Sequence, residues 1–179
     1  SRSFYTSKKA IRTPDDLKGL KIRTMNNQMA INMVNSMGGS ATPLSYSELY
    51  TAIQQGVVDG AENNAPSFVS SNHHEISKYY TLDEHASQPD VLLISTKFWD
   101  SLTSEQQEWV QSAADESAQA QKVFWNESVE ESMKAAKEKG VEIIIPEQSL
   151  FAEKSKSVLE NFIKEYPEME EVVKQIKAK

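Results

Sequence analysis

The sequence predicts an α/β fold, and three observations on its 179 residues support that class. Short apolar segments alternate with short helical segments through the first two-fifths of the chain, as they do in parallel α/β units. Residues 104–139 contain neither Pro nor Gly and predict one long helix. Hydrophobic residues at 39% and charged residues at 25% are typical of a chain that buries a core.

The first elements are marked by helix-start residues and by glycines. Thr13 is suited to cap a short helix with Pro14 in its first turn, and Gly19 ends that helix. The elements that follow are, in order, a strand at 20–24, a helix at 29–37, a strand at 41–44, a helix at 47–53 and a strand that begins at 57 and runs to 64. This order predicts a parallel sheet.

The second half of the chain is dominated by the long helix. Two extended segments, 79–82 and 90–95, precede it as predicted strands, and a strand at 141–146 and helices at 151–166 and 168–177 follow it. Its apolar side chains change face near Phe124, because those up to Phe124 share one side and those from Trp125 to Ala136 share nearly the opposite one. A helix that packs on one core has its apolar side chains on one face throughout, so this pattern predicts a helix that bridges two lobes.

Composition and motifs exclude several classes of function. A net charge of −7, from 19 basic and 26 acidic residues, argues against a nucleic-acid-binding protein. The chain has no cysteine, no apolar run long enough to span a bilayer, and no nucleophile elbow, phosphate loop or dinucleotide glycine motif. We therefore expect no enzyme activity, no cofactor and no metal site. The chain opens at Ser1 without a start methionine or signal peptide, and we expect a piece of a longer protein.

The three histidines offer weak functional signals. His73 and His74 are adjacent, so their side chains point apart, and we expect surface or helix-end positions rather than a metal site. His85 lies between two predicted strands, where it either makes a structural hydrogen bond or lies near a crossing between lobes.

A more informative group of residues is defined by position in the fold. In open α/β sheets, ligands bind outside the carboxyl ends of the strands, and Arg23, Tyr46 and Asn63 each lie at or after such an end. Arg23 is suited to bidentate recognition of a carboxylate, Tyr46 to an apolar wall, and Asn63 to donating and accepting hydrogen bonds. The alternatives are a surface salt bridge for Arg23, core packing for Tyr46 and a turn role for Asn63.

Three segments resemble the substrate-binding proteins of TRAP transporters, of the DctP type. They are residues 13–23 (TPDDLKGLKIR), 41–44 (ATPL) and 48–63 (ELYTAIQQGVVDGAEN), and residues 99–102 (WDSL) before the long helix are also similar to the family. The resemblance implies a periplasmic-binding-protein-like, class II-like fold of two lobes joined by a long bridging helix. This chain then covers mainly the second lobe.

The resemblance also implies roles for five residues. Arg23 matches the arginine that pairs with the substrate carboxylate, and Asn63 matches an asparagine of the same site. Asn26 matches a polar position shortly after that arginine, Tyr46 an aromatic wall of the pocket, and Arg2 a second arginine of the family.

The implied domain organisation divides the chain into three parts. Residues 1–88 form the ligand-binding region of the second lobe, and residues 129–179 return to that lobe. Residues 89–128, a strand and the first half of the bridging helix, pack on a first lobe that family members carry before this point. Without that lobe we expect the apolar side chains of residues 89–128 to drive self-association, unless the lobe is supplied separately.

The resulting expectation is a periplasmic or otherwise extracytoplasmic receptor that captures an organic acid and delivers it to TRAP membrane subunits. A sugar acid such as a uronate is the favoured ligand and a dicarboxylate the second. A sensing or interaction domain with the same fold is the alternative, because fold and site would be shared.

Overall fold

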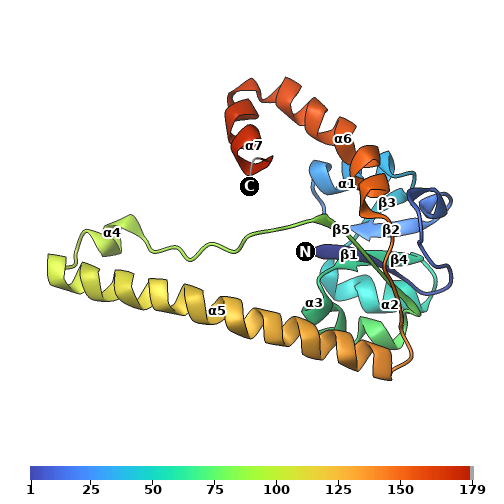
Figure 1. Ribbon diagram of the computed structural model, residues 1–179, viewed down its shortest axis with the longest axis horizontal. Coiled ribbons are helices and arrows are strands. Elements are labelled where there is room, and N and C mark those ends of the chain that lie inside the picture. The colour runs from blue at the N-terminus through green and yellow to red at the C-terminus, as the bar shows by residue number, and fades with distance from the viewer. Residues whose placement is uncertain (178–179) are drawn as a thin grey trace.

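The computed structural model describes residues 1–177 and builds them around a mixed β-sheet covered by helices on both faces (Figure 1). The strand order within these residues is β3-β2-β4-β1-β5-β6. The strands are β1 (Arg2–Thr6), β2 (Lys21–Thr24), β3 (Ser40–Pro43), β4 (Gly60–Asn63), β5 (Tyr79–Ala86) and β6 (Glu142–Ile144). The predicted α/β class is confirmed.

The sheet is not wholly parallel, which corrects the sequence prediction. β2 pairs in parallel with β3 and β4, and β5 with β6, but β1 is inserted between β4 and β5 and is antiparallel to both. β1 was not predicted, although its residues Phe4 and Tyr5 are fully buried. Successive side chains of a strand point to opposite faces, so these two aromatic residues anchor one helix layer each.

Two apolar cores lie on the two faces of the sheet. Phe4 packs in a cluster with side chains of η1 (Pro14–Leu17), α1 (Gln28–Ser36) and α6 (Gln148–Glu165). Tyr5 packs on the other face with α2 (Leu49–Gln54), α3 (Ala65–Ser70) and the end of α5 (Ser104–Glu138). The short 3-10 helices η2 (Tyr46–Glu48) and η3 (His73–Glu75) flank this second layer. The layers are visible in Figure 1, with α1 and α6 above the sheet and α2, α3 and α5 below it.

Gly60 is required where β4 begins beside β1. A Cβ atom at this position would lie 2.1 Å from the Tyr5 carbonyl oxygen and 2.8 Å from the Thr6 side chain. Gly60→Ala is therefore expected to lower the free energy of unfolding by more than about 2 kcal/mol, because the central strands must separate. Chemical denaturation measures this change, and an unaltered free energy of unfolding would contradict the register of β1 with β4.

α5 extends far beyond the sheet, as Figure 1 shows. Its C-terminal end packs on α3 and buries Ser132 and Ala136, whereas Trp109 and Phe124 in the other part are 62% and 63% exposed. The short helix α4 (Thr96–Trp99) lies at the far end of α5. Among residues 1–177, no helix is both long and apolar enough to cross a membrane.

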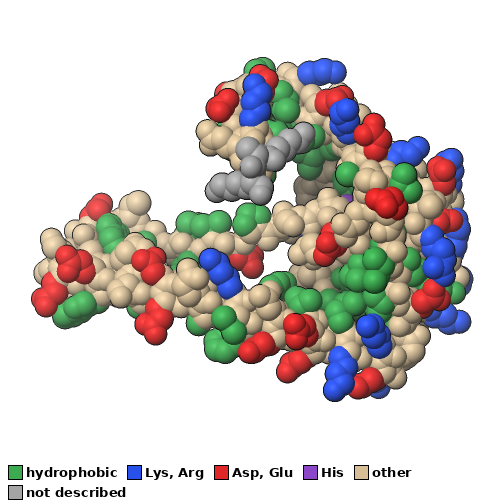
Figure 2. Space-filling view, viewed as in Figure 1, with side chains coloured by type: hydrophobic (Ala, Val, Ile, Leu, Met, Phe, Trp, Pro, Cys, Tyr) green, Lys and Arg blue, Asp and Glu red, His purple; other side chains and the backbone are tan. Residues whose placement is uncertain are grey.

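The predicted strand at 90–95 is wrong. Residues 87–95 form an extended linker between β5 and α4 without regular structure. A strand needs a neighbour for its backbone hydrogen bonds, and none of the described strands pairs with this linker. Its apolar side chains consequently face solvent, and Leu93 is 82% exposed. Figure 2 shows hydrophobic side chains along both the linker and α5.

The C-terminal elements follow the prediction closely. α6 ends at Glu165, before Pro167, and a short 3-10 helix, η4 (Pro167–Met169), leads into α7 (Glu170–Lys177). α7 turns back toward the linker in Figure 1. Val172 and Ile176 of α7 are exposed, so this helix does not bury its apolar face against the described residues.

Candidate functional site

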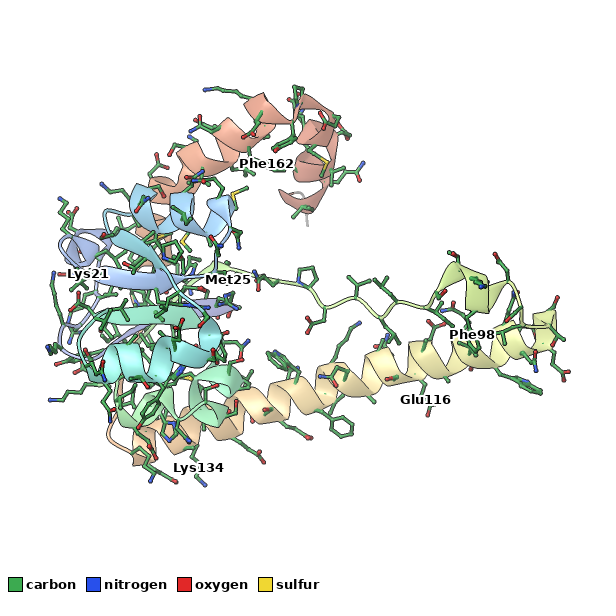
Figure 3. The ribbon with its side chains drawn as sticks, turned by 180° about the vertical axis from the view of Figure 1, so that it is seen from behind. Lys21, Met25, Phe98, Glu116, Lys134 and Phe162 are labelled. Atoms are coloured by element: carbon green, nitrogen blue, oxygen red, sulfur yellow. The ribbon has the colours of Figure 1, made fainter. Side chains whose placement is uncertain are left out.

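A cleft of about 710 Å³ opens where the sheet, the linker and α5 meet. This volume is typical of sites for small molecules. Its walls include Arg2 from β1, Arg23 from β2, Asn63 from β4 and the Tyr46 side chain from η2. Figure 3 labels both ends of the β2 region, with Met25, which also lines the cleft, on the side that faces the linker and α5. The cleft therefore lies at the carboxyl ends of the parallel strands, where such sheets bind ligands.

Arg23 is buried at this edge with part of its guanidinium uncommitted. Its Nε donates to the Leu44 carbonyl oxygen at 2.8 Å, and the central carbon of the guanidinium lies 5.5 Å from the centre of the Tyr46 ring. Arg23 is only 5% exposed, and within residues 1–177 no carboxylate pairs with it. The expected alternative of a surface salt bridge is therefore excluded within this part of the chain. Burial lowers the pKa of Arg23, since nothing fully replaces its lost hydration.

Tyr46 and Asn63 form a connected polar wall beside Arg23. Tyr46 is 41% exposed, so it is not a core residue, and its hydroxyl lies 2.7 Å from Ser71 Oγ. Asn63 Nδ2 approaches the same hydroxyl at 3.5 Å, while Asn63 Oδ1 accepts a hydrogen bond from the Asn64 backbone N–H at 2.9 Å. Asn63 thus makes the local turn contact that was expected as the alternative to a site role. Its amide group nevertheless also lines the cleft.

Arg2 lines the cleft with its charge already neutralised. Its Nε and Nη2 donate to the two carboxylate oxygens of Glu62 at 2.5 and 2.9 Å, and Nη2 also donates to the Glu62 carbonyl oxygen at 3.1 Å. Nη1 lies 3.4 Å from Gln88 Oε1 in the linker. Of the two arginines in the cleft, Arg23 is therefore the one free to bind an anion.

A buried charge network continues from Glu62 to His85 and Asp83. His85 Nδ1 lies 2.6 Å from Asp83 Oδ2, and His85 Nε2 lies 3.6 Å from Glu62 Oε2. Burial alone would lower the pKa of His85, but Asp83 and Glu62 outweigh it and raise this pKa to about 9. Burial would raise the pKa of Glu62, and its contacts with His85 and Arg2 hold it below the ordinary value. The expected structural hydrogen bond of His85 is present, within a network of two cations and two anions.

This network predicts a stability that falls at alkaline pH. The pKa of His85 is about 9 in the folded state and 6.5 in the unfolded chain. Charged His85 therefore contributes its full stabilisation below pH 6.5, and this contribution is lost as pH rises to about 9. We expect a loss of roughly 2–3 kcal/mol across this interval. Denaturation at pH 6, 7.5 and 9 measures it, and His85→Gln should flatten the dependence. A wild-type curve as flat as that of the variant would contradict a charged His85.

His73 packs against the Tyr46 ring. His73 and His74 are both buried, so neither has the surface position that was one of the two expected. The two lie in η3, so the helix-end position is correct. His73 Nδ1 is 2.8 Å from the Tyr5 hydroxyl, and its ring meets the Tyr46 ring edge-on at 5.6 Å. Burial and the charge of Arg23 lower the pKa of His73 to about 4. A neutral His73 at pH 7 supports Tyr46 without adding charge to the cleft.

Sequence reasoning missed the polar lining contributed by α3, the linker and α5. Hydroxyl groups come from Ser67, Ser70 and Ser71, and further amides from Asn64, Gln88 and Gln121. Asp90, Lys122 and Trp125 complete the wall opposite the sheet. Glu62, an acidic residue within a strand beside Asn63, was a sequence signal for a buried ion pair, but its position did not identify Arg2 as the partner.

Asn26 is the one predicted site residue that does not line this cleft. It is exposed in the loop between β2 and α1, and its role toward a ligand stays a prediction. Among residues 1–177, no group of three or more His, Asp or Glu side chains is arranged to hold a metal ion. Within residues 1–177, the sheet side of the cleft places hydrogen-bonding groups around the Arg23 guanidinium.

Comparison with known protein families and sequences gives a consistent result. The family model for bacterial extracellular solute-binding proteins, family 7 (DctP), matches residues 1–165. A solute-binding protein of Chromohalobacter salexigens is 38% identical over 177 residues, which are 98% of this chain and 53% of that protein. The chain therefore spans about half the length of the curated relatives it matches.

Solved structures similar to this chain belong to the same class of protein. A TRAP periplasmic solute-binding protein from Sulfitobacter sp. NAS-14.1 with bound β-D-galacturonate superposes with a TM-score of 0.91 at 45% identity, covering 97% of this chain and 58% of that one. A second, from Chromohalobacter salexigens with bound D-glucuronate, has a TM-score of 0.95 at 38% identity, covering 99% and 60%. The periplasmic-binding-protein-like fold expected from the sequence is confirmed.

Proposed function

Because this chain belongs to the bacterial extracellular solute-binding proteins of family 7, we propose that it carries the carboxylate-binding cleft of a TRAP-type receptor. In this proposal the receptor works outside the cytoplasm, binds an organic acid and delivers it to the membrane subunits of the transporter. The observation that carries the proposal is the buried Arg23 guanidinium, which has no carboxylate partner within residues 1–177 and faces a cleft of ligand size.

The geometry of Arg23 suits a carboxylate. Its Nε is held by the Leu44 carbonyl, so the two terminal nitrogens are pre-oriented as a fork. A planar fork matches the two oxygens of a carboxylate and adds charge-assisted hydrogen bonds from a side chain that is itself only 5% exposed. Arg2 contributes orientation and hydrogen bonding rather than net charge, because Glu62 neutralises it.

The remainder of the lining favours a polyhydroxylated acid. Serine hydroxyls and carboxamides from α3, β4, the linker and α5 outnumber the charged groups in the cleft. Such groups both donate and accept hydrogen bonds, as hydroxyls of a sugar require. A hexuronate is therefore the ligand we propose first and a dicarboxylate second. The galacturonate and glucuronate bound to two similar structures support the same choice.

A thermal-shift screen of the natural full-length protein tests this proposal. The library contains hexuronates, aldonates, C4 dicarboxylates, keto acids and the neutral parent sugars at equal concentration. We expect hexuronates to raise the melting temperature most and neutral sugars to leave it unchanged, because ligand binding stabilises the folded state. A screen in which no carboxylate shifts the melting temperature would contradict the proposed function.

The exposed apolar side chains of the linker and α5 also fit a larger receptor. Val91, Leu92 and Leu93 of the linker and Trp109 and Phe124 of α5 are more than half exposed. Covering such side chains contributes about 1.5–3 kcal/mol each, so we propose that they pack against a further lobe, as the sequence resemblance implies. The isolated 179-residue chain should then self-associate.

Light scattering at micromolar concentration tests this consequence. We expect a mass above the 20.1 kDa of one chain. A monodisperse 20.1 kDa species with a cooperative melt would show that these side chains need no cover.

A further inference from the structure

Three side chains on the wall opposite Arg23 are not part of the group proposed to bind the carboxylate. They are Asp90 in the linker and Lys122 and Trp125 in α5, and all three line the cleft. Asp90 and Lys122 are exposed, and within residues 1–177 neither side chain forms an ion pair or a hydrogen bond. The cleft therefore has a second set of uncommitted polar groups, separate from Arg23.

The position of Lys122 and Trp125 on α5 explains why they meet the cleft. At about 100° per residue, both lie on the face that carries the buried Ser132 and Ala136 further along the helix. Phe124 lies about 100° from Trp125 and about 160° from Lys122 around the helix, on the exposed apolar side of α5. The face that packs on α3 thus continues past the lobe and presents Lys122 and Trp125 to the cleft rather than to the apolar surface.

These three residue types complement a sugar ring. The ammonium of Lys122 donates hydrogen bonds only, the carboxylate of Asp90 accepts only, and a sugar hydroxyl can do both. The Trp125 ring adds a flat apolar surface with an N–H donor, suited to the C–H face of a pyranose. Orientation in ligand sites commonly depends on a few such polar groups beside an aromatic surface.

We propose that Asp90, Lys122 and Trp125 form the hydroxyl-recognising end of the cleft and hold the ring of a hexuronate whose carboxylate binds Arg23. The inference rests on the proposed function and adds to it the residues that select among acids. Recognition is then divided in space, because the lobe binds the carboxylate and the bridging segments read the hydroxyl groups. Substitutions at the two ends should have different consequences.

The test is calorimetric titration of the natural full-length protein and its Lys122→Met variant with D-galacturonate and D-glucuronate. Lys134→Met is the matched control, because Lys134 is an exposed lysine of the same helix outside the cleft. We expect Lys122→Met to weaken the tighter of the two hexuronates about tenfold or more and to leave the melting temperature unchanged. Lys134→Met should change neither affinity by more than about twofold.

Two further variants keep the inference falsifiable. Asp90→Asn should also weaken the hexuronate, and Trp125→Phe should retain more affinity than Trp125→Ala, since the phenyl ring keeps a stacking surface. If the wild type binds a hexuronate while Lys122→Met, Asp90→Asn and Trp125→Ala all bind it within twofold, the inference is wrong and the proposed function stands. If the wild type binds no carboxylate at all, the proposed function itself fails.

Discussion

Replacing Arg23 by alanine is expected to reduce the affinity of the natural full-length protein for its acid by about 100-fold or more. A charge-assisted, bidentate contact with a buried guanidinium is worth a few kcal/mol, and within residues 1–177 the other arginine of the cleft is already paired with Glu62. Arg23→Lys should reduce the affinity nearly as much, because lysine keeps the charge but lacks the planar fork that the Leu44 carbonyl helps to orient. Calorimetric titration with the best hexuronate measures both effects.

Arg12→Ala is the matched control for this prediction. Arg12 is exposed and pairs with Glu142 at 2.5 Å on the surface, away from the cleft. Its loss should leave the affinity unchanged. An affinity of Arg23→Ala within about tenfold of the wild type, with an intact melting transition, would remove Arg23 as the carboxylate anchor.

Replacing Glu62 by glutamine is expected to cause the largest loss of stability, about 3 kcal/mol or more. Glu62 lies between the buried cations of Arg2 and His85 and is itself 2% exposed, so the variant leaves two positive charges facing one remaining carboxylate. Chemical denaturation at pH 7 measures the free energy of unfolding. The variant should also weaken ligand binding, because Arg2 loses the contact that fixes its position beside the cleft.

Glu142→Gln provides the comparison at the surface. It removes the exposed pair with Arg12, which is expected to contribute between 0 and about 1 kcal/mol. If Glu62→Gln were no more destabilising than Glu142→Gln, the buried network would not have the energetic role assigned to it.

Sequence reasoning located the strand-end residues of the cleft because strand ends are local features. Asn63 ends β4 and Arg23 is the last residue but one of β2, both short strands bounded by recognisable glycines and helices, and Tyr46 follows β3. Their convergence then follows from the general geometry of α/β sheets. The face change of α5 near Phe124 was also readable, since helical periodicity is a property of neighbouring residues.

The partners of Arg2 could not be predicted from the sequence, because the order of strands in a sheet does not depend on neighbouring residues alone. β1 lies between β4 and β5, which are about 60 and 80 residues away along the chain. That order alone brings Arg2 to Glu62 and Glu62 to His85. Nothing in the immediate sequence around Arg2 indicates either contact.

The linker and α5 illustrate two different limits of structure prediction from the sequence. The apolar run at 91–94 has the composition of a strand, but strand formation depends on a partner that the described residues do not provide. Lys122 and Trp125 look like ordinary surface and core residues of a helix, and only the placement of α5 beside the sheet makes them part of the cleft. Tertiary arrangement, rather than propensity, decides both cases.

Titration with two matched ligands tests directly whether binding requires a carboxylate. The natural full-length protein is titrated with D-galacturonate and with D-galactose, which differ only in the group proposed to contact Arg23. We expect the acid to bind at least about 100-fold more tightly than the neutral sugar, equivalent to the loss expected in Arg23→Ala. Equal affinities for galacturonate and galactose would contradict it.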